Sequence, residues 1–463
     1  MLQLEWLQQA LAATMNLHVL QAGTNKEWNG VQFDSRLVEP GNLFIPLTSG
    51  TRDGHVFIPN ALQNGAHAII LSDSTYLQTI PPSCTVFLID DTEKALQALA
   101  AAYRQLLSTR IIAVTGSNGK TTTKDMTAHL LRSCFKTYST YKNLNNHLGV
   151  PLSLLQIAED DEMAVIEMGM NHAGELDFLG QLVQPNYSII TNVNDAHIEF
   201  FGTREKIAEA KAELITHTDP KGCLLLNGDD PLVRAMSSRY AGQVYLYGIS
   251  SDDTDIQATA IHADADGTHF QVRIGEQISF PCQIPLYGKH NVSNLLPGLL
   301  LAHLLGASIE ALQEQARTLQ ISGMRFERII GKNEALLIND AYNASPTSMR
   351  AAIDTFASIL PEKKKVLVIG DMFELGEDSA QLHAGLGDYV NSYASQLSCV
   401  FTLGESMEHF HHHYEGRKQH CTTHQELAEA LQPYLLPNYA LLFKASRGMT
   451  LEKVIEALLP VKA

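Results

Sequence analysis

Short, continuous apolar runs recur along the chain, and segments with apolar residues at helical spacing separate many of them. Such runs predict buried strands, because a strand covered on both faces has no polar side to alternate with. They lie at 67–71, 85–89, 110–114, 163–170, 187–193, 224–227, 335–338, 365–369, 399–403 and 440–443. Helical spacing predicts helices over 91–107, 120–135, 203–217 and 295–305. Strands that alternate with helices indicate an α/β fold with parallel sheets.

The length of 463 residues is typical of about three domains. We expect a small α/β N-terminal domain over 1–90 and a central P-loop domain over 91–322, which would be a parallel-sheet ATPase domain. After Gly323 the alternation of strands and helices starts again, which predicts a C-terminal Rossmann-like, doubly wound domain over 323–463. Residues 244–285 are strand-rich and polar, and we expect them to form an antiparallel edge.

One polar turn lies between a predicted strand and a predicted helix and has the sequence VTGSNGKTT, beginning at Val114. Glycines in such a turn let backbone N–H groups surround phosphate oxygens, and the helix N-terminus adds partial positive charge. Lys120 would reach the terminal phosphates, and the hydroxyl of Thr121 would bind Mg²⁺. Val114 replaces the first glycine of the general phosphate-loop pattern, but Gly-Lys-Thr is intact. We therefore predict ATP or GTP binding by Gly116, Ser117, Asn118, Gly119, Lys120, Thr121 and Thr122.

Polar residues also gather where other predicted strands end. Glu167 ends one buried run, and His197 follows the next; ligands of open parallel sheets lie at these strand ends. We expect Glu167 to face the phosphates, where it could hold a metal, whereas His197 is either a structural residue or a metal or phosphate residue. The loops at 33–44 and 50–55 suit a diphosphate or a sugar but could equally be turns. The asparagine-rich loop at 141–151 could bind an amide or a carboxylate, or be a turn.

Three other polar groups are harder to interpret from pattern. Lys211 lies on the predicted helix 203–217, where a lysine is usually a solvated surface residue. Three residues before the helix 295–305 could contact a nucleotide base through hydrogen-bond donors and an imidazole ring: His290, Asn291 and Asn294. One histidine cluster has no second ligand set, and we predict that it forms a surface loop: His409, His411, His412 and His413.

Composition limits the possible partners and compartment. The net charge of −17 argues against nonspecific binding to nucleic acid or to anionic membranes. The six cysteines form no C-x-x-C pair, which argues against a disulfide framework or a zinc site and fits reduced thiols in the cytosol. The N-terminus has neither a basic region nor an apolar core, and no apolar run approaches about 18 residues. We expect a cytoplasmic monomer without a signal peptide or membrane span.

Several segments together resemble the Mur ligase family of ATP-dependent amino-acid and peptide ligases, and the resemblance covers nearly the whole chain. They are DSR and PGNLF within 34–44, DGH at 53–55, the loop 143–151, the segment 340–346, and GDM with ELG within 370–376. Met324 and Ser345 depart from the family pattern.

The resemblance implies a reaction and its partners. The members most similar in these segments join D-alanyl-D-alanine to UDP-N-acetylmuramoyl-tripeptide in cytoplasmic peptidoglycan precursor synthesis. In them the peptide carboxylate attacks the γ-phosphate of ATP, and the dipeptide amine then attacks the resulting acyl phosphate. ATP and Mg²⁺ are the implied cofactors.

The resemblance also implies a role for individual residues. Those at the metal are Thr121, Glu167, His197 and Lys211, with Lys211 carbamylated. The catalytic set is Lys120, Glu167, His197 and Lys211. On the nucleotide, Asn291 and Asn294 match adenine-side residues, Asp340 the ribose carboxylate, and Arg325 a phosphate-directed arginine. Ser35 and Arg36 lie where the UDP-sugar binds, Asn145 and Asn146 lie beside the peptide, and the candidates for the dipeptide side are Lys444, Ser446 and Arg447.

The phosphate loop also occurs in proteins with other activities. A sibling ligase that adds one amino acid, or a folylpolyglutamate synthetase, shares the phosphate loop. A P-loop hydrolase or regulatory nucleotide-binding protein would turn over ATP without any peptide. Because the nucleotide residues belong to two predicted domains, we also expect these domains to close over a cleft, with a hinge near Ser322 and Gly323.

Overall fold

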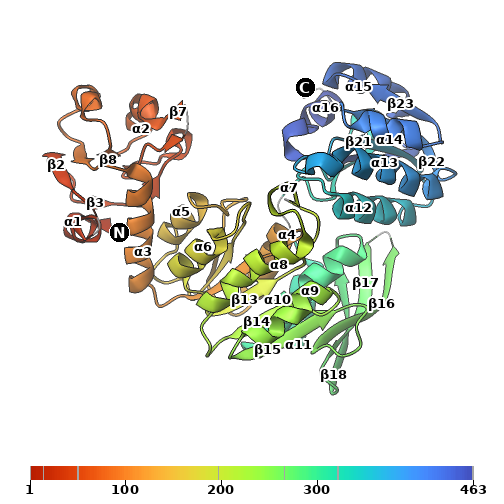
Figure 1. The fold of residues 1–463 in the computed structure, drawn as a ribbon, viewed down its shortest axis with the longest axis horizontal. Helices are drawn as coiled ribbons and strands as arrows, with labels where there is room; N and C mark the ends of the chain where they lie inside the picture. Colours follow the sequence, from red (N-terminus) through yellow and green to blue (C-terminus); the bar gives the residue numbers. More distant parts are fainter. Residues whose placement is uncertain are drawn as a thin grey trace.

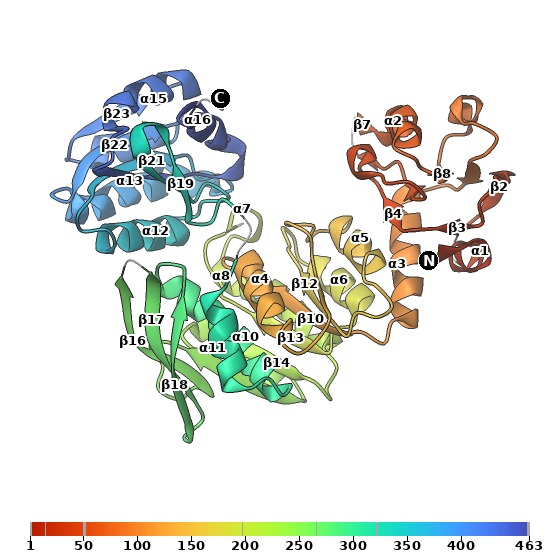
Figure 2. The same cartoon turned by 180° about the vertical axis from the view of Figure 1, so that it is seen from behind.

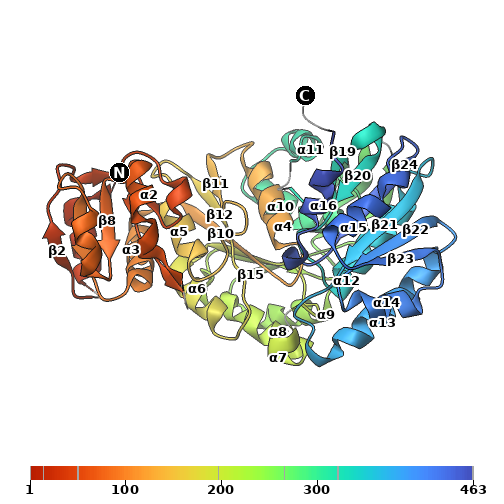
Figure 3. The same ribbon diagram turned by 90° about the horizontal axis from the view of Figure 1, so that it is seen from above.

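The computed structural model describes residues 2–13, 15–49, 52–196, 198–264, 266–320 and 323–460. Figure 1 shows three lobes, with the N-terminal and C-terminal lobes at opposite ends of the central one. Seen from above, in Figure 3, the lobes follow one another along the long axis. Each lobe contains a largely parallel sheet, which confirms the predicted α/β class.

The N-terminal lobe has a five-stranded sheet with the strand order β2-β9-β8-β5-β4. Strands β4, β5, β8 and β9 pair in parallel, and β2 runs antiparallel to β9. Two short antiparallel pairs, β1 with β3 and β6 with β7, lie outside this sheet. The strands are β1 (Leu2–Gln3), β2 (His18–Gln21), β3 (Glu27–Trp28), β4 (Val31–Gln32), β5 (Leu43–Phe44), β6 (Thr48–Ser49), β7 (Arg52–Asp53), β8 (Ala68–Leu71) and β9 (Thr85–Leu88). The helices are α1 (Leu4–Ala12) and α2 (Ile58–Gln63), and α3 (Thr92–Leu106) leads from this lobe into the central one, where it packs against two further helices.

The central lobe has a nine-stranded sheet with the order β11-β12-β10-β13-β14-β15-β16-β17-β18. Pairing is parallel from β11 to β16, and β16, β17 and β18 form an antiparallel edge. The prediction of an antiparallel edge over 244–285 is thus confirmed for these three strands and wrong for β15, which pairs in parallel on both sides. The strands are β10 (Arg110–Thr115), β11 (Thr137–Ser139), β12 (Met163–Glu167), β13 (Tyr187–Ile190), β14 (Cys223–Asn227), β15 (Gln243–Gly248), β16 (Ile256–Asp264), β17 (Gly267–Ile274) and β18 (Ile278–Ile284). The helices are α4 (Lys120–Leu131), α5 (Gly149–Leu155), α6 (Glu175–Val183), α7 (Ile198–Phe201), α8 (Arg204–Ala212), α9 (Pro231–Ala235), α10 (Lys289–Leu304) and α11 (Ile309–Arg317).

The C-terminal lobe has a six-stranded sheet with the order β19-β20-β24-β21-β22-β23, in which only the β19–β20 pair is antiparallel. Apolar clusters cover both faces of this sheet, as expected of a doubly wound fold. The strands are β19 (Glu327–Ile330), β20 (Leu336–Asn339), β21 (Lys364–Gly370), β22 (Leu397–Leu403), β23 (Lys418–Cys421) and β24 (Tyr439–Lys444). The helices are α12 (Pro346–Ser358), α13 (Ser379–Val390), α14 (Met407–His413), α15 (His424–Ala430) and α16 (Glu452–Ala457), several of which are visible from behind in Figure 2.

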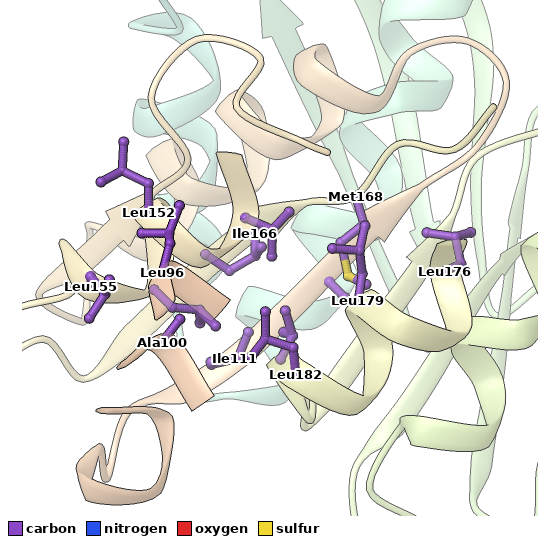
Figure 4. Close-up of a cluster of buried hydrophobic side chains, with 14 of the residues drawn as sticks. Leu96, Ala100, Ile111, Leu152, Leu155, Ile166, Met168, Leu176, Leu179 and Leu182 are labelled. Carbon is purple, nitrogen blue, oxygen red and sulfur yellow. The ribbon is translucent and has the colours of Figure 1, made fainter. Parts of the chain in front are cut away.

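Strand β10 lies between β12 and β13 and is buried on both faces. Its residues alternate between two apolar clusters: Ile111 belongs to one, and Ile112 to the other. The first cluster joins α3, α5 and α6 to the sheet, as Figure 4 shows, and continues into the N-terminal lobe. Its labelled members are Leu96, Ala100, Ile111, Leu152, Leu155, Ile166, Met168, Leu176, Leu179 and Leu182. This packing holds β10, and hence the turn after it, in the middle of the molecule.

Several predicted boundaries were wrong by a few residues. Helix α4 ends at Leu131 rather than at 135, because the chain turns at Ser133, whose hydroxyl donates to the Leu130 carbonyl. Helix α8 ends at Ala212 rather than at 217, and strand β12 ends at Glu167 rather than at 170. Helix α10 begins at Lys289 rather than at 295. The polar loop predicted to run to 151 ends at Leu148, because Asn146 Oδ1 accepts the N–H groups of Leu148 and Gly149 (3.2 and 2.9 Å).

The histidine cluster does not form a loop. It lies on α14, which is helical because Met407 and Phe410, one turn apart, are both buried. Among the described residues, no three His, Cys, Asp or Glu side chains gather as a metal site. Within the same residues, every helix is too short or too polar to cross a membrane.

Lys124 on α4 is a buried cation that organises the loop after β11. Its ammonium donates to the carbonyls of Thr140 (2.7 Å) and Lys142 (3.2 Å) and pairs with Asp125 (2.8 Å). Only 1% of the residue is exposed. These bonds attach the loop that carries the asparagine-rich segment to the helix of the phosphate loop.

We therefore expect Lys124→Met to lower stability by about 3 kcal/mol, because it removes the cation from a buried ion pair and from two carbonyl acceptors. For a domain of this size, that corresponds to a fall of about 6–12 °C in the melting midpoint. Calorimetry would measure it, with Lys94→Met as the control, since the Lys94 side chain is 74% exposed. Equal midpoints for the two variants would contradict this role.

Candidate active site

A cavity of about 480 Å³ lies between the central and C-terminal lobes. The central lobe contributes the phosphate loop, the end of β12 and the start of α10, and the C-terminal lobe contributes loops at the ends of its strands. Predicted site residues from both lobes line it, among them Lys120, Glu167, Asn294, Arg325, Asp340 and Lys444. The structure thus brings together residues that are far apart in the chain.

The two glycines of the phosphate loop have positive φ angles, +148° at Gly116 and +80° at Gly119, which side chains disfavour. There is also no room for a side chain at either position. A Cβ atom on Gly116 would overlap Thr191 Oγ1, and one on Gly119 would overlap Asn294 Oδ1. Both glycines are therefore required by conformation and by close approach.

A second strand end holds the loop in shape. The N–H of Asn118 donates to Asn192 Oδ1 (2.9 Å), and Asn192 Nδ2 returns a bond to the Asn118 carbonyl (3.0 Å). The Thr191 hydroxyl donates to the same carbonyl (2.7 Å), and the N–H of Ser117 donates to the Asn192 carbonyl (2.8 Å). Sequence analysis missed Thr191 and Asn192; their position just after β13, the neighbour of β10, is the signal that identifies them.

Lys120 opens α4 and is turned back onto its own loop. Its ammonium donates to the carbonyls of Gly116 (2.9 Å) and Ser117 (3.1 Å). Burial lowers the pKa of Lys120, and the charge of Arg325 lowers it further, while Glu167 and Glu374 oppose this shift. A cation held here by two neutral carbonyls is suited to pair with an arriving phosphate.

Glu167 ends β12 and is 1% exposed. Asn145 Nδ2 donates to its Oε1 (2.7 Å), and the Thr140 hydroxyl accepts its backbone N–H (3.1 Å). Its Oε2 is buried and has no hydrogen-bond partner among the described residues. Asn145 and Asn146 also line the cavity, so the asparagine-rich loop is part of the site.

Lys211 is not the solvated residue that helical pattern suggested. It is 2% exposed, on the inner side of α8. Burial lowers the pKa of Lys211 well below its usual value, and the nearby charge of Lys120 lowers it further. Its amine is thereby favoured in the neutral, nucleophilic form. His197, the other predicted metal residue, lies outside the described residues.

The C-terminal lobe contributes an ion pair and an arginine to the cavity wall. Lys444 Nζ bonds Asp340 Oδ2 (2.7 Å), and Asp340 Oδ1 accepts the N–H of Phe326 (3.2 Å). The guanidinium of Arg325 lies 4.0 Å from the centre of the Tyr342 ring, and its buried Nε has no partner among the described residues.

Ser345, which departs from the family pattern, joins the two lobes directly. Its hydroxyl accepts a bond from Asn118 Nδ2 (3.3 Å), and it caps α12 by accepting the N–H of Ser348 (3.4 Å). The two lobes are thus in contact at the phosphate loop. Ser322, half of the predicted hinge, lies outside the described residues.

Three family models match this chain in succession. They are the Mur ligase family catalytic domain at residues 27–104, the Mur ligase middle domain at 114–302, and the glutamate ligase domain at 324–447. A Bacillus subtilis protein named UDP-N-acetylmuramoyl-tripeptide–D-alanyl-D-alanine ligase is 39% identical over 439 residues, 93% of each chain. The chain belongs to the Mur ligase family.

Solved structures of Mur ligases agree with the fold. A crystal structure of MurF from Acinetobacter baumannii superposes with a TM-score of 0.85 at 31% identity, over 98% of each chain. MurF from Thermotoga maritima, crystallised with ADP, gives 0.79 at 28% identity, over 93% of this chain and 96% of the other. The three-lobed architecture is therefore that of a Mur ligase.

The cavity does not include every residue that the family resemblance suggested. Ser35 and Arg36 are in the N-terminal lobe, where Arg36 is exposed and pairs with Asp34 (2.7 Å). Ser446 is buried and does not line the cavity, and its hydroxyl accepts the N–H of Phe373 (2.8 Å). Arg447, the next residue, does line the cavity.

On the nucleotide side, Asn291 and Asn294 lie in the first turns of α10. Asn291 Nδ2 donates to the Tyr287 carbonyl (2.7 Å), which fixes its orientation. His290 lines the cavity beside them, and burial lowers its pKa, which favours a neutral ring. Sequence analysis missed Tyr342 and Glu374, two further lining residues that follow strands β20 and β21.

We expect Gly116→Ala to weaken ATP binding about 10- to 100-fold, because the new Cβ would meet Thr191 and the φ angle of +148° is strained. Calorimetric titration with ATP would measure the loss. Gly306→Ala is the matched control: its φ is also positive, at +105°, but its Cβ would meet nothing within 4 Å. Unchanged ATP affinity in Gly116→Ala would contradict this interpretation of the loop.

Proposed function

We propose that this protein is an ATP-dependent ligase that joins D-alanyl-D-alanine to UDP-N-acetylmuramoyl-tripeptide through an acyl phosphate. The observation that carries the proposal is one cavity lined by the phosphate loop, the buried Glu167 and the cations of the C-terminal lobe. The names of its relatives supply the substrates. We expect it to act in the cytoplasm as a monomer, in peptidoglycan precursor synthesis.

The residues present account for the first step. Backbone N–H groups of the phosphate loop and the N-terminus of α4 would bind the phosphates of ATP. Attack by the tripeptide carboxylate on the γ-phosphate moves negative charge toward the β–γ bridging oxygen and the transferring group. Lys120 and Arg325 face this position from the two lobes and would stabilise that charge. Asp340 and the two asparagines of α10 would bind the ribose and the adenine.

The donor set also fits Mg²⁺. Glu167 offers a buried carboxylate oxygen without a partner, and Thr121, the first residue after Lys120, is in the cavity wall. The neutral amine favoured at Lys211 can add CO₂, and the resulting carbamate supplies the anionic oxygens that Mg²⁺ prefers. With His197, these residues would hold the metal. When bound, Mg²⁺ would offset charge on the transferring phosphoryl group.

The second step needs the amine and the absence of water. The dipeptide amine attacks the acyl phosphate carbon, an amide bond forms, and phosphate leaves. Because the cavity walls belong to two lobes, closure of the lobes would exclude water from the acyl phosphate. We assign Asn145 and Asn146 to the tripeptide, Ser35 and Arg36 to the UDP-sugar, and Lys444, Ser446 and Arg447 to the dipeptide side.

We expect multiple-turnover ADP formation only when ATP, Mg²⁺, UDP-N-acetylmuramoyl-tripeptide and D-alanyl-D-alanine are all present. A coupled assay for ADP would measure it, with Gly116→Ala as a control for the nucleotide site. Equal ADP formation without the peptides would indicate a hydrolase and contradict the proposal. Equal turnover when a single amino acid replaces the dipeptide would indicate a sibling ligase.

We expect Lys211→Ala to lose activity at least about 100-fold, because the metal loses an anionic ligand. A short carboxylic acid should restore part of the activity by filling the space of the carbamate. Carbon NMR with labelled CO₂ should show a carbamate signal in the unaltered protein but not in the variant. Lys206→Ala, at an exposed position of the same helix, is the control. Full activity of Lys211→Ala without rescue would refute the role.

A further inference from the structure

The loop that follows β11 fixes Glu167, the buried carboxylate that we propose as a metal ligand. The hydroxyl of Thr140 accepts the backbone N–H of Glu167 (3.1 Å), and Asn145 Nδ2 donates to Glu167 Oε1 (2.7 Å). The Asn145 carbonyl also accepts the N–H of Gly169 (2.8 Å), just beyond the strand. One carboxylate oxygen is therefore engaged, and the other, Oε2, is left buried without a hydrogen-bond partner in the described part of the chain.

The middle of this loop has a strained conformation. Lys142 has a φ of +51°, in the left-handed region that a residue with a side chain keeps only where its surroundings impose it. The N–H of Leu144 donates within the loop, to the Tyr141 carbonyl (3.3 Å), and so does not attach it to another element. The loop therefore needs an attachment from outside if Thr140 and Asn145 are to stay in place against Glu167.

Lys124, in the second turn of α4, supplies this attachment. Its ammonium donates to the carbonyls of Thr140 (2.7 Å) and Lys142 (3.2 Å). The first carbonyl belongs to the residue that accepts the N–H of Glu167, and the second belongs to the residue with the strained φ. Lys124 is 1% exposed and does not line the cavity. Any effect that it has on the reaction must therefore pass through the loop.

We propose that Lys124 is a positioning residue for the divalent cation. Its ammonium fixes the loop 140–145, and this loop orients Glu167 so that Oε2 is presented to the metal. The inference rests on the proposed function and deepens it, since it explains how the fold orients one ligand of the cation. Groups that orient a metal ligand from behind typically contribute a factor of about 10 to 100 to metal affinity. Because α4 begins at Lys120, the same lysine also links the metal ligand to the helix of the phosphate loop.

The test measures Mn²⁺ binding without nucleotide, through the electron paramagnetic resonance signal of free Mn²⁺, as a probe of the Mg²⁺ site. We expect Lys124→Met to raise the Kd for Mn²⁺ about 10- to 100-fold, because Glu167 loses its orientation. The affinity for ADP in the presence of EDTA should stay near that of the unaltered protein, since Asn192 holds the phosphate loop independently. Circular dichroism would establish a temperature at which every variant is folded.

A second variant tests whether the effect passes through the loop. Asn145→Ala removes the bond to Glu167 Oε1 and should weaken Mn²⁺ binding by a similar factor. The double variant Lys124→Met, Asn145→Ala should bind Mn²⁺ no more weakly than the weaker single variant, because two changes in one network are not additive.

Lys365→Met is the control for lost stability. Lys365 is also a buried lysine whose ammonium donates to a backbone carbonyl, that of Ala357, but it lies on β21 of the C-terminal lobe and does not line the cavity. The Mn²⁺ affinity of this variant should equal that of the unaltered protein.

An unchanged Mn²⁺ affinity in Lys124→Met would overturn the positioning role, and so would losses that multiply in the double variant. An equal fall in ADP affinity would indicate general damage to the central lobe and would also overturn it. ADP formation by the unaltered protein with ATP, Mg²⁺ and both peptides tests the ligase function separately. Failure of the proposed function is thereby distinguished from failure of the positioning role.

Discussion

The proposed chemistry depends on the burial of two lysines of the central lobe, Lys120 in the cavity wall and Lys211 on α8. Burial lowers the pKa of both, and the charge of Lys120 further lowers that of Lys211. The fold therefore places two amines where little water is available to solvate their charged forms. Phosphates would stabilise the charged form of Lys120, and carbamylation would convert the neutral amine of Lys211 into an anion. The site is arranged for anions that arrive with the substrates.

The site is shared between the central and C-terminal lobes. The phosphate loop belongs to the central lobe, but Asp340 and Arg325, which we propose as the ribose and phosphate partners, come from the C-terminal lobe. Asn118 of the phosphate loop and Ser345 of the C-terminal lobe form a hydrogen bond (3.3 Å). The contact between the lobes therefore lies beside the position that we propose for the nucleotide. An acyl phosphate formed between the lobes would be shielded from water once the lobes close.

The sequence pattern predicted those elements that depend only on residues close together in the chain. Strand β10, the phosphate loop and α4 follow from a short apolar run, two glycines and a lysine, and the parallel sheets follow from alternation along the chain. Lys211 could not be interpreted in this way, because burial on α8 depends on packing against other elements. Thr191, Asn192 and Glu374 were missed for a similar reason: their roles come from strand order, which local sequence does not contain. Helix α14 was mistaken for a loop because its histidines concealed the Met407 and Phe410 spacing.

The central claim is that the tripeptide carboxylate, and not water, attacks the γ-phosphate of ATP. The most direct measurement labels both oxygens of the terminal tripeptide carboxylate with a heavy oxygen isotope and analyses the phosphate released during turnover by mass spectrometry. The account predicts that each released phosphate carries one labelled oxygen, since the acyl C–O bond breaks when the amine attacks. Released phosphate without label would show that water is the acceptor and would contradict the account.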